Sequence, residues 1–342
     1  MQARGLVLVT GGSGYIAGFC IAQLLQEGWR VRATLRSLKR GEAVRANLSK
    51  LADPADRLSF VAADLDRDAG WAEAVGGCDH VLHVASPLPS GRPGSDDELV
   101  RPARDGALRV LAAARAAGAR RVVMTSSIAA VAYGRGLRRG PFTEADWTDE
   151  TNLADTSAYE RSKTIAERAA WAWVKDQGGN LELATINPGL VLGPVLSRDY
   201  AISIDVVKKL LDGSLPGLPA FGWPLVDVRD IADLHLRAMT SPDAAGQRFV
   251  ATGSFYWMAD VARTLRARRP DLASRVPTRR LPDWTLKLAA FFEPMLRDRL
   301  FELGKKRTFS SDKARSLLGW SPRPNDETIA DTADSLATLK IV

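Results

Sequence analysis

The segment TSAYERSKTIAE, at residues 156–167, places Tyr159 four residues before Lys163. Four residues make just over one helical turn, so a helix here would hold both side chains on one face. A phenol has an unperturbed pKa of about 10, and a neighbouring ammonium favours its charged form. Such a pair suits proton transfer to or from a substrate oxygen. Alone, a Tyr and a Lys at this spacing more often belong to an ordinary surface helix, so the rest of the chain must decide.

A second group of candidate residues lies in TSSIAAV, where Ser126 and Ser127 follow an apolar, β-branched run. In open α/β folds, ligands bind at the carboxyl ends of the strands. A ketone that accepts a hydride develops negative charge on its oxygen, which then needs a proton and a second hydrogen-bond donor. Tyr159 can supply the proton and Ser127 the second hydrogen bond, while Lys163 adjusts the phenol. The predicted chemistry is carbonyl reduction, or alcohol oxidation in the reverse direction.

A glycine-rich segment, VTGGSGYIAG at residues 9–18, follows the first predicted strand and opens the first predicted helix. It places Gly11, Gly14 and Ala17 at the three positions of a G-x-x-G-x-x-G/A pattern. The glycines allow a tight turn and a close backbone approach to a pyrophosphate, whose charge meets unpaired N–H groups at the helix start. We therefore predict dinucleotide binding here, with Tyr15 and Ile16 in the cofactor site.

The residues that end the second predicted strand favour one dinucleotide over the other. An Asp or Glu at this place would bind the ribose 2′-OH of NAD. This chain has Leu35 followed by Arg36, with Arg32 and Lys39 nearby. Because a guanidinium can hold a phosphate through two parallel hydrogen bonds, we expect NADPH, with Arg36 and Lys39 at its 2′-phosphate. Asp64, after the third strand, could receive the adenine amine or cap the following turn.

The order of apolar segments predicts an α/β fold, a doubly wound parallel sheet (Rossmann) with a smaller, discontinuous C-terminal substrate lobe. Short β-branched runs alternate with Ala- and Leu-rich helical patterns through the first half of the chain. The predicted strands are 6–10, 31–35, 58–63, 80–85, 121–126 and 182–187, and the predicted helices lie near 15–27, 39–51, 96–117 and 157–177. The predicted NADP-binding domain comprises 1–187 and 226–252, and the predicted substrate-binding lobe comprises 188–225 and 253–342.

Pro- and Gly-rich segments after residue 187 indicate loops that shape a pocket. The expected pocket is hydrophobic and suits an aryl or alkyl aldehyde or ketone; its candidate residues are Pro87, Leu88, Leu190, Phe221 and Trp223. An apolar stripe at helical spacing near the C terminus is expected to pack on the lobe, with an oligomer or membrane-surface contact as the alternative; it comprises Trp284, Leu288, Phe291, Phe292 and Met295.

Composition and charge argue against several classes of function. The net charge is +7, but the 47 basic and 40 acidic residues are mixed along the chain, and no nucleic-acid-binding motif accompanies them. No run of 18 apolar residues predicts a membrane span. Cys20 and Cys78 are too few for a disulfide framework, so we expect a cytoplasmic protein. His80, His83 and His235 lack metal-ligand spacing, and no metal is predicted. The expected partner is a small-molecule carbonyl or alcohol, and the expected assembly is a monomer or homodimer.

Several motifs, taken in order, make the chain resemble the extended short-chain dehydrogenases/reductases. They are TGGSGYIAG (10–18), Asp64–Leu65, HVASP (83–87), TSS (125–127), YERSK (159–163), NPG (187–189) and LVLGP (190–194). Within that superfamily, VRATLR, HVASP, YxxSKTxAE and KARSLLGW are similar to dihydroflavonol reductases, cinnamoyl-CoA reductases and microbial NADPH-dependent aldehyde or ketone reductases.

The resemblance implies roles for particular residues. It implies that Ser127, rather than Ser126, is catalytic, and that Lys163 also binds the nicotinamide ribose. The residues that it places along the cofactor are Leu65, Ala85, Ser86, Pro188, Gly189 and Val191. Two departures limit the substrate: Ala132 stands where plant dihydroflavonol reductases tend to have Asn, and TSAYERSK replaces the NWYCYGK of cinnamoyl-CoA reductases. Neither a dihydroflavonol nor a CoA thioester is therefore supported.

Three alternatives stay open. A sugar-nucleotide epimerase or dehydratase shares the Ser, Tyr and Lys, although an epimerase would retain NAD, which Leu35 and Arg36 disfavour, and a dehydratase would add an acid/base pair near Ser127. A hydroxysteroid dehydrogenase shares them as well. A non-catalytic NADP-sensing protein would keep the fold but generally lose Tyr159 and Lys163.

Overall fold

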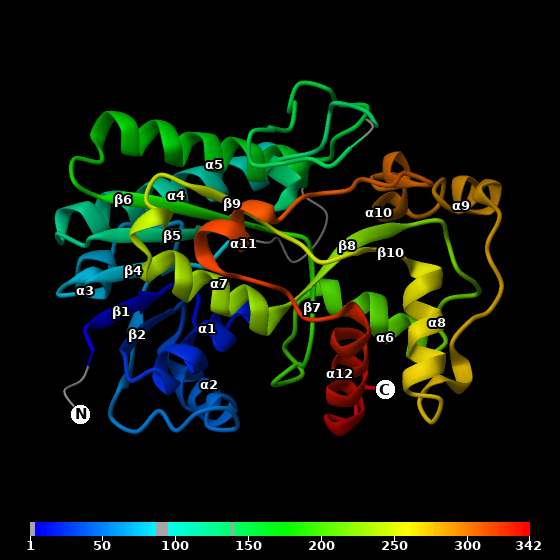
Figure 1. The fold of residues 1–342 in the computed structure, drawn as a ribbon, viewed down its shortest axis with the longest axis horizontal. Helices are drawn as coiled ribbons and strands as arrows, with labels where there is room; N and C mark the ends of the chain where they lie inside the picture. The colour runs from blue at the N-terminus through cyan, green and yellow to red at the C-terminus, as the bar shows by residue number, and fades with distance from the viewer. Residues whose placement is uncertain (1–3, 87–94, 138–139) are drawn as a thin grey trace.

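The computed structural model describes residues 4–86, 95–137 and 140–342. Within them, the largest feature is a seven-stranded sheet in the order β3-β2-β1-β4-β5-β6-β9 (Figure 1), and its pairings are parallel. Its strands are β1 (Leu6–Val9), β2 (Arg30–Leu35), β3 (Leu58–Ala62), β4 (His80–His83), β5 (Arg121–Thr125), β6 (Glu182–Pro188) and β9 (Arg248–Ala251). The strand order reverses between β1 and β4, which is where doubly wound sheets bind ligands.

Helices cover both faces of the sheet, and they bury two separate cores. One core includes residues of α1 (Tyr15–Gln26), α2 (Gly41–Leu48), α7 (Val228–Thr240) and α11 (Asp312–Leu318). The other includes α3 (Trp71–Val75), α4 (Asp97–Ala116) and α5 (Ala158–Gln177). Along β1, Val7 and Val9 belong to the first core and Leu8 to the second. A strand buried on both faces has an unbroken apolar sequence, so the predicted doubly wound α/β fold is confirmed.

A smaller group of strands and helices lies beyond the carboxyl ends of the strands of the large sheet (Figure 1). It contains a three-stranded sheet in the order β10-β8-β7, made of β7 (Leu190–Leu192), β8 (Gly222–Asp227) and β10 (Phe255–Trp257). A third core joins this sheet to α6 (Asp205–Leu211), α8 (Met258–Arg268) and α12 (Asn325–Thr338). The 3₁₀ helices are Leu38–Arg40, Ile128–Ala130, Ile202–Ile204, Pro242–Ala244, Ala273–Arg275 and Leu300–Glu302. After β8 the chain returns through α7 to β9, which pairs with β6.

The division into two domains stays a prediction. Residues 226–252 do carry the return to the large sheet, through α7 and β9. The later α11, which the prediction assigns to the substrate lobe, contributes Ala314 and Leu318 to the core that α1 and α7 share, and Trp320 lies in the same core.

The apolar stripe near the C terminus does not pack as expected. Its helices are α9 (Asp283–Ala289) and α10 (Pro294–Arg297). The exposed members are Trp284 (66%), Leu288 (54%), Phe291 (80%) and Phe292 (80%), whereas Leu286 is the buried residue of α9. The packing expectation is therefore wrong for these four residues, and the side chain of Met295 lies outside the described part of the chain. Over the described residues, the structure has no helix long and apolar enough to cross a membrane.

Candidate active site

The glycine-rich loop joins β1 to α1 at the carboxyl edge of the sheet. Gly11 has φ +68°, a conformation that side chains other than glycine rarely adopt, and its N–H donates to Thr34 Oγ1 at 2.9 Å. Gly14 is the N-cap of α1; no side chain caps the helix, and its first turn holds no acidic residue. The N–H groups at this helix start can therefore meet the negative charge of a pyrophosphate.

The segment after β4 lies directly against that loop. Ala85 N–H donates to Thr10 Oγ1 at 2.9 Å, and a Cβ added to Gly11 would come within 3.0 Å of the Ala85 methyl group. Thr10 Oγ1 also lies 3.0 Å from Nδ1 of His83, whose pKa burial lowers to about 3, so this imidazole is neutral. Next to Ala85, the Ser86 hydroxyl accepts a hydrogen bond from Lys163 Nζ at 3.0 Å. The predicted cofactor loop is thus connected to helix α5.

A capping box fixes the start of α5 and hence the position of Tyr159. Ser157 Oγ accepts from the Tyr159 N–H at 3.2 Å, and Glu160 Oε2 accepts from the Ser157 N–H at 2.8 Å. This S-x-x-E pattern ends the preceding loop at a defined residue. Tyr159 therefore lies in the first turn of α5, and Lys163 lies one turn further along the same face.

The structure brings Ser127, Tyr159 and Lys163 together. Ser127 follows β5, where its Oγ accepts from the Ala129 N–H at 3.1 Å. Burial raises the pKa of Tyr159, while a hydrogen bond with Ser127 acts to lower that pKa. Lys163 Nζ lies 5.9 Å from the centroid of the Tyr159 ring, and burial lowers the pKa of this ammonium to about 8. The hydrogen bond of Lys163 goes to Ser86 rather than to the phenol.

A second cation near the phenol was missed by the sequence reasoning. The guanidinium carbon of Arg299 lies 5.8 Å from the centroid of the Tyr159 ring, and Nη1 donates to Glu160 Oε1 at 3.1 Å. The charge of Arg299 also acts to lower the pKa of Tyr159. Arg299 and Glu160 are 139 residues apart in the chain, so no local pattern could have linked them.

A buried carboxylate network behind the serines was missed as well. Glu167 is fully buried, and its donors include Ser126 Oγ (2.5 Å), Asn187 Nδ2 (2.7 Å), Arg248 Nε (2.7 Å) and Thr185 Oγ1 (2.9 Å). Asn187 Nδ2 also donates to the backbone carbonyl of Ser127 at 3.0 Å. Glu167 lies one turn after Lys163 on α5. Through Asn187 and Arg248 the network joins α5 to β6 and β9, and through Asn187 it reaches the backbone at Ser127. The signal in the sequence was the Glu that ends YxxSKTxAE.

Comparison with known proteins identifies the family of this chain. Residues 7–251 match the model of the NAD dependent epimerase/dehydratase family. The chain belongs to this family. The resemblance to extended short-chain dehydrogenases/reductases, and to their reductase branch, is confirmed.

Several known proteins are similar to this chain over nearly its whole length. It is 34% identical to cinnamoyl-CoA reductase CAD2 of Medicago truncatula, over 98% of this chain and 96% of the relative. It is 29% identical to ketoreductase azaE of Aspergillus niger, over 96% and 97% of the two chains. Among solved structures, the complex of yeast methylglyoxal/isovaleraldehyde reductase Gre2 with NADPH is similar, with a TM-score of 0.79, 25% identity and coverage of 98% of this chain and 100% of that one.

The cations on and after β2 differ in whether other groups of the protein already bind them. Leu35 is buried, while Arg36 and Lys39 are exposed at the end of β2. Arg32 is committed elsewhere, because its Nη1 donates to the carbonyl oxygens of Glu73, Ala74 and Gly76 around the end of α3. Within the described residues, Arg36 and Lys39 have no hydrogen-bond partner through their side chains, so they can meet a phosphate in a way that Arg32 cannot.

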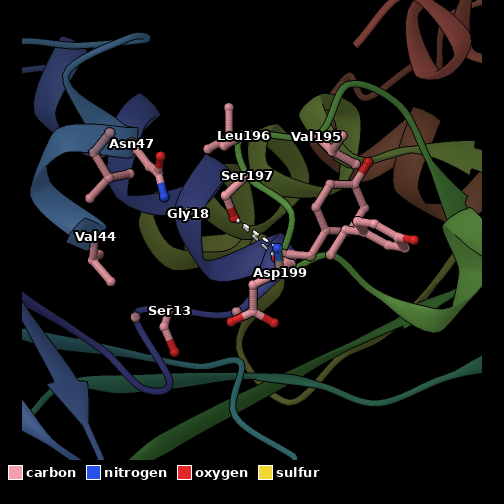
Figure 2. A pocket seen from close by; sticks show the side chains of 13 residues that line it. Ser13, Gly18, Val44, Asn47, Val195, Leu196, Ser197 and Asp199 are labelled. Atoms are coloured by element: carbon pink, nitrogen blue, oxygen red, sulfur yellow. Dashed lines mark hydrogen bonds between the residues drawn. The ribbon is translucent and has the colours of Figure 1, made fainter. Parts of the chain in front are cut away.

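A pocket lies beside the glycine-rich loop, and neither Ser127 nor Tyr159 lines it. Figure 2 shows Ser13 and Val44 on one side and the segment containing Ser197 and Asp199 on the other. Asp199 N–H donates to Ser197 Oγ at 3.2 Å, and the Asp199 carboxylate pairs with Arg40. The segment after β7 thus lines one pocket together with the predicted cofactor loop and α2.

The remaining predicted residues lie as follows. Asp64 Oδ1 accepts from the Asp66 N–H at 3.2 Å, a local turn contact. Leu65 packs toward Gly106 of α4. Tyr15 and Ile16 pack at the margin of the first core, and Pro188, Gly189, Leu190 and Val191 run from β6 into β7.

Phe221 stacks on Trp223 with centroids 6.3 Å apart. Pro87 and Leu88 lie outside the described residues. Within the described residues, no cluster of potential metal ligands occurs.

Proposed function

We propose that the protein is an NADPH-dependent carbonyl reductase that reduces an aldehyde or ketone, and oxidises the alcohol in reverse. The observation that carries the proposal is the environment of the Tyr159 phenol. Ser127 acts to lower the pKa of the phenol through hydrogen bonding, and Lys163 Nζ and the Arg299 guanidinium carbon lie 5.9 and 5.8 Å from the ring centroid. An acid with a second donor and neighbouring cations is what a developing alkoxide requires.

The residues present fit a bound NADPH. The uncapped start of α1 and the tight turn at Gly11 suit the pyrophosphate, and exposed Arg36 and Lys39 suit the 2′-phosphate. Ala85, Ser86 and the segment from Pro188 to Val191 would border the nicotinamide end. When bound, the cofactor supplies the hydride that reduces the carbonyl carbon.

The protein's own groups handle the oxygen and the proton. Tyr159 gives its phenolic proton to the carbonyl oxygen as negative charge develops there. Ser127 donates a hydrogen bond to the same oxygen, and the positive charge of Lys163 stabilises the phenolate that remains. Because burial raises the pKa of Tyr159, the phenol holds its proton until the reaction demands it.

The rival activities have less support in this chain. An epimerase needs retained NAD, but the end of β2 offers Leu35 and Arg36 where an acid would bind the ribose. A dehydratase needs an added acid/base pair near Ser127, but the next residues are Ile128, Ala129 and Ala130, all buried. A hydrophobic substrate suits the Phe221–Trp223 stack of the lobe.

The test is NADPH oxidation, followed by absorbance, against aryl aldehydes, aryl ketones, α-keto esters, steroids and a dihydroflavonol, and repeated with NADH. Oxidation by a simple aldehyde or ketone, faster with NADPH than with NADH, supports the proposal. Tight NADPH binding without turnover on the whole panel, or conversion of a nucleotide sugar without net cofactor oxidation, would overturn it.

A further inference from the structure

Arg299 reaches the proposed proton donor from the far end of the chain. It follows α10, which lies beside α9 (Figure 1), and precedes the 3₁₀ helix Leu300–Glu302. Its guanidinium carbon and Lys163 Nζ lie at nearly equal distances, 5.8 and 5.9 Å, from the centroid of the Tyr159 ring. The Tyr159 ring therefore has beside it a second cation that the basic reaction does not require.

One nitrogen of the Arg299 guanidinium is hydrogen-bonded to Glu160, and the side chain is partly exposed. Nη1 donates to Glu160 Oε1, whose side chain is 1% exposed, while the side chain of Arg299 is 49% exposed. Glu160 is itself held by the Ser157 N–H at 2.8 Å. Among the described residues, Nε and Nη2 of Arg299 have no hydrogen-bond partner. These two groups form the edge that matches a carboxylate through two parallel hydrogen bonds.

Two further acids of this region, Glu302 and Asp155, are engaged by cations other than Arg299. Glu302 accepts from Arg307 Nη1 at 2.7 Å, and burial raises the pKa of Glu302 to about 7, so its negative charge is incomplete at neutral pH. Asp155 accepts from Lys305 Nζ at 2.5 Å and from Arg307 Nη2 at 2.8 Å. Glu302 and Asp155 therefore do not use Nε and Nη2 of Arg299, which an anion from solution can bind.

We propose that Arg299 selects carbonyl substrates that carry a carboxylate a few bonds from the reacting carbonyl, which it binds through Nε and Nη2. This inference rests on the proposed reductase function and narrows its substrate class. Two other roles make different predictions. If Arg299 only adjusts Tyr159, its loss slows acids and neutral substrates alike; if it only anchors the segment after α10 to α5, its loss lowers stability without changing selectivity.

The experiment compares matched acids and esters. The probes are phenylglyoxylate with its methyl ester and 4-carboxybenzaldehyde with its methyl ester, each reduced with saturating NADPH. The proteins are the unmodified chain, Arg299→Gln, Arg299→Lys and Arg297→Gln. Arg297 is an exposed residue of α10, two positions from Arg299, and serves as the matched control for loss of one positive charge.

The inference predicts that the unmodified protein has a higher kcat/KM for at least one acid than for its ester. Arg299→Gln should lower that acid-to-ester ratio about 10- to 100-fold, the usual effect of losing hydrogen bonds to a charged group. Arg299→Lys should lower the ratio less, and Arg297→Gln should leave it unchanged. Circular dichroism and the NADPH Kd establish that each variant is folded.

Each other outcome overturns the inference in a recognisable way. A preference for both esters in the unmodified protein, an unchanged ratio in Arg299→Gln, or an equal fall for acids and esters contradicts it while leaving the reductase proposal intact. If Arg299→Gln does not fold, the ratio in the unmodified protein and in Arg299→Lys decides. Absence of NADPH oxidation with all four probes and with the wider panel contradicts the reductase proposal itself.

Discussion

The Lys163 ammonium donates a hydrogen bond to Ser86 Oγ at 3.0 Å, which ties α5 to the segment that follows β4. That segment lies against Gly11 through Ala85. Burial lowers the pKa of Lys163 to about 8, and the charge of Glu167 acts in the opposite direction. The proposed proton-transfer residues and the proposed cofactor loop therefore share one hydrogen-bonded connection, and its charge changes in a pH range that kinetics can reach.

The rate of carbonyl reduction should fall as pH rises through the pKa of Lys163. Below about pH 8 the ammonium is charged and stabilises the phenolate, so kcat/KM should be level; above it the charge is lost and kcat/KM should decline. Ser86→Ala removes an acceptor that favours the charged ammonium, so its decline should begin at lower pH. A pH–rate profile checks both. Identical profiles, or a level rate up to the ordinary Lys pKa of about 10.4, would contradict the assignment.

Arg36 should determine the choice between NADPH and NADH. Arg36→Glu replaces a phosphate-binding cation by a repelling carboxylate, so the ratio of kcat/KM with NADPH to that with NADH should fall about 10- to 100-fold or more. Arg30 is exposed at the opposite end of β2, and Arg30→Glu makes the same charge change away from the site. The account is wrong at this point if the two variants change the ratio equally.

Glu167 should be essential to stability. In Glu167→Gln, Arg248 is left buried without its ion-pair partner, and the expected loss in the free energy of unfolding is about 3–5 kcal/mol. Asp233→Asn breaks the exposed pair with Arg237 and should cost less than about 1 kcal/mol. Denaturant unfolding measures both. A loss of under about 1 kcal/mol for Glu167→Gln would show that the network is not the support inferred for the Ser127 backbone.

The large sheet and its nucleotide-binding loop could be predicted because their signals are local. The central strand β1 is an unbroken apolar run, and the glycines of the loop lie within four residues of one another. The Tyr159–Lys163 pair is local too, since a capping box begins the helix directly before it.

The features that the sequence did not predict depend on distant contacts. Arg299 approaches Tyr159 only in the folded chain, since 139 residues separate it from Glu160, and the donors of Glu167 come from three further segments. Arg32 is near Arg36 in the chain, but only the fold shows that its guanidinium is used at the end of α3. The stripe at Phe291 and Phe292 shows that helical spacing reveals an apolar face but not whether another element covers it.

The most direct test of the central claim is NADPH oxidation by Tyr159→Phe beside the unmodified protein, with NADPH binding measured on the same samples. This change removes the phenolic oxygen and leaves the ring, and a lost general acid typically costs about 10²- to 10⁴-fold in rate. The account predicts a fall of at least that size in kcat with an NADPH Kd changed by less than about threefold, since the proposed cofactor contacts lie on other residues. Turnover within a few-fold of the unmodified protein would contradict the assignment of Tyr159 as the proton donor.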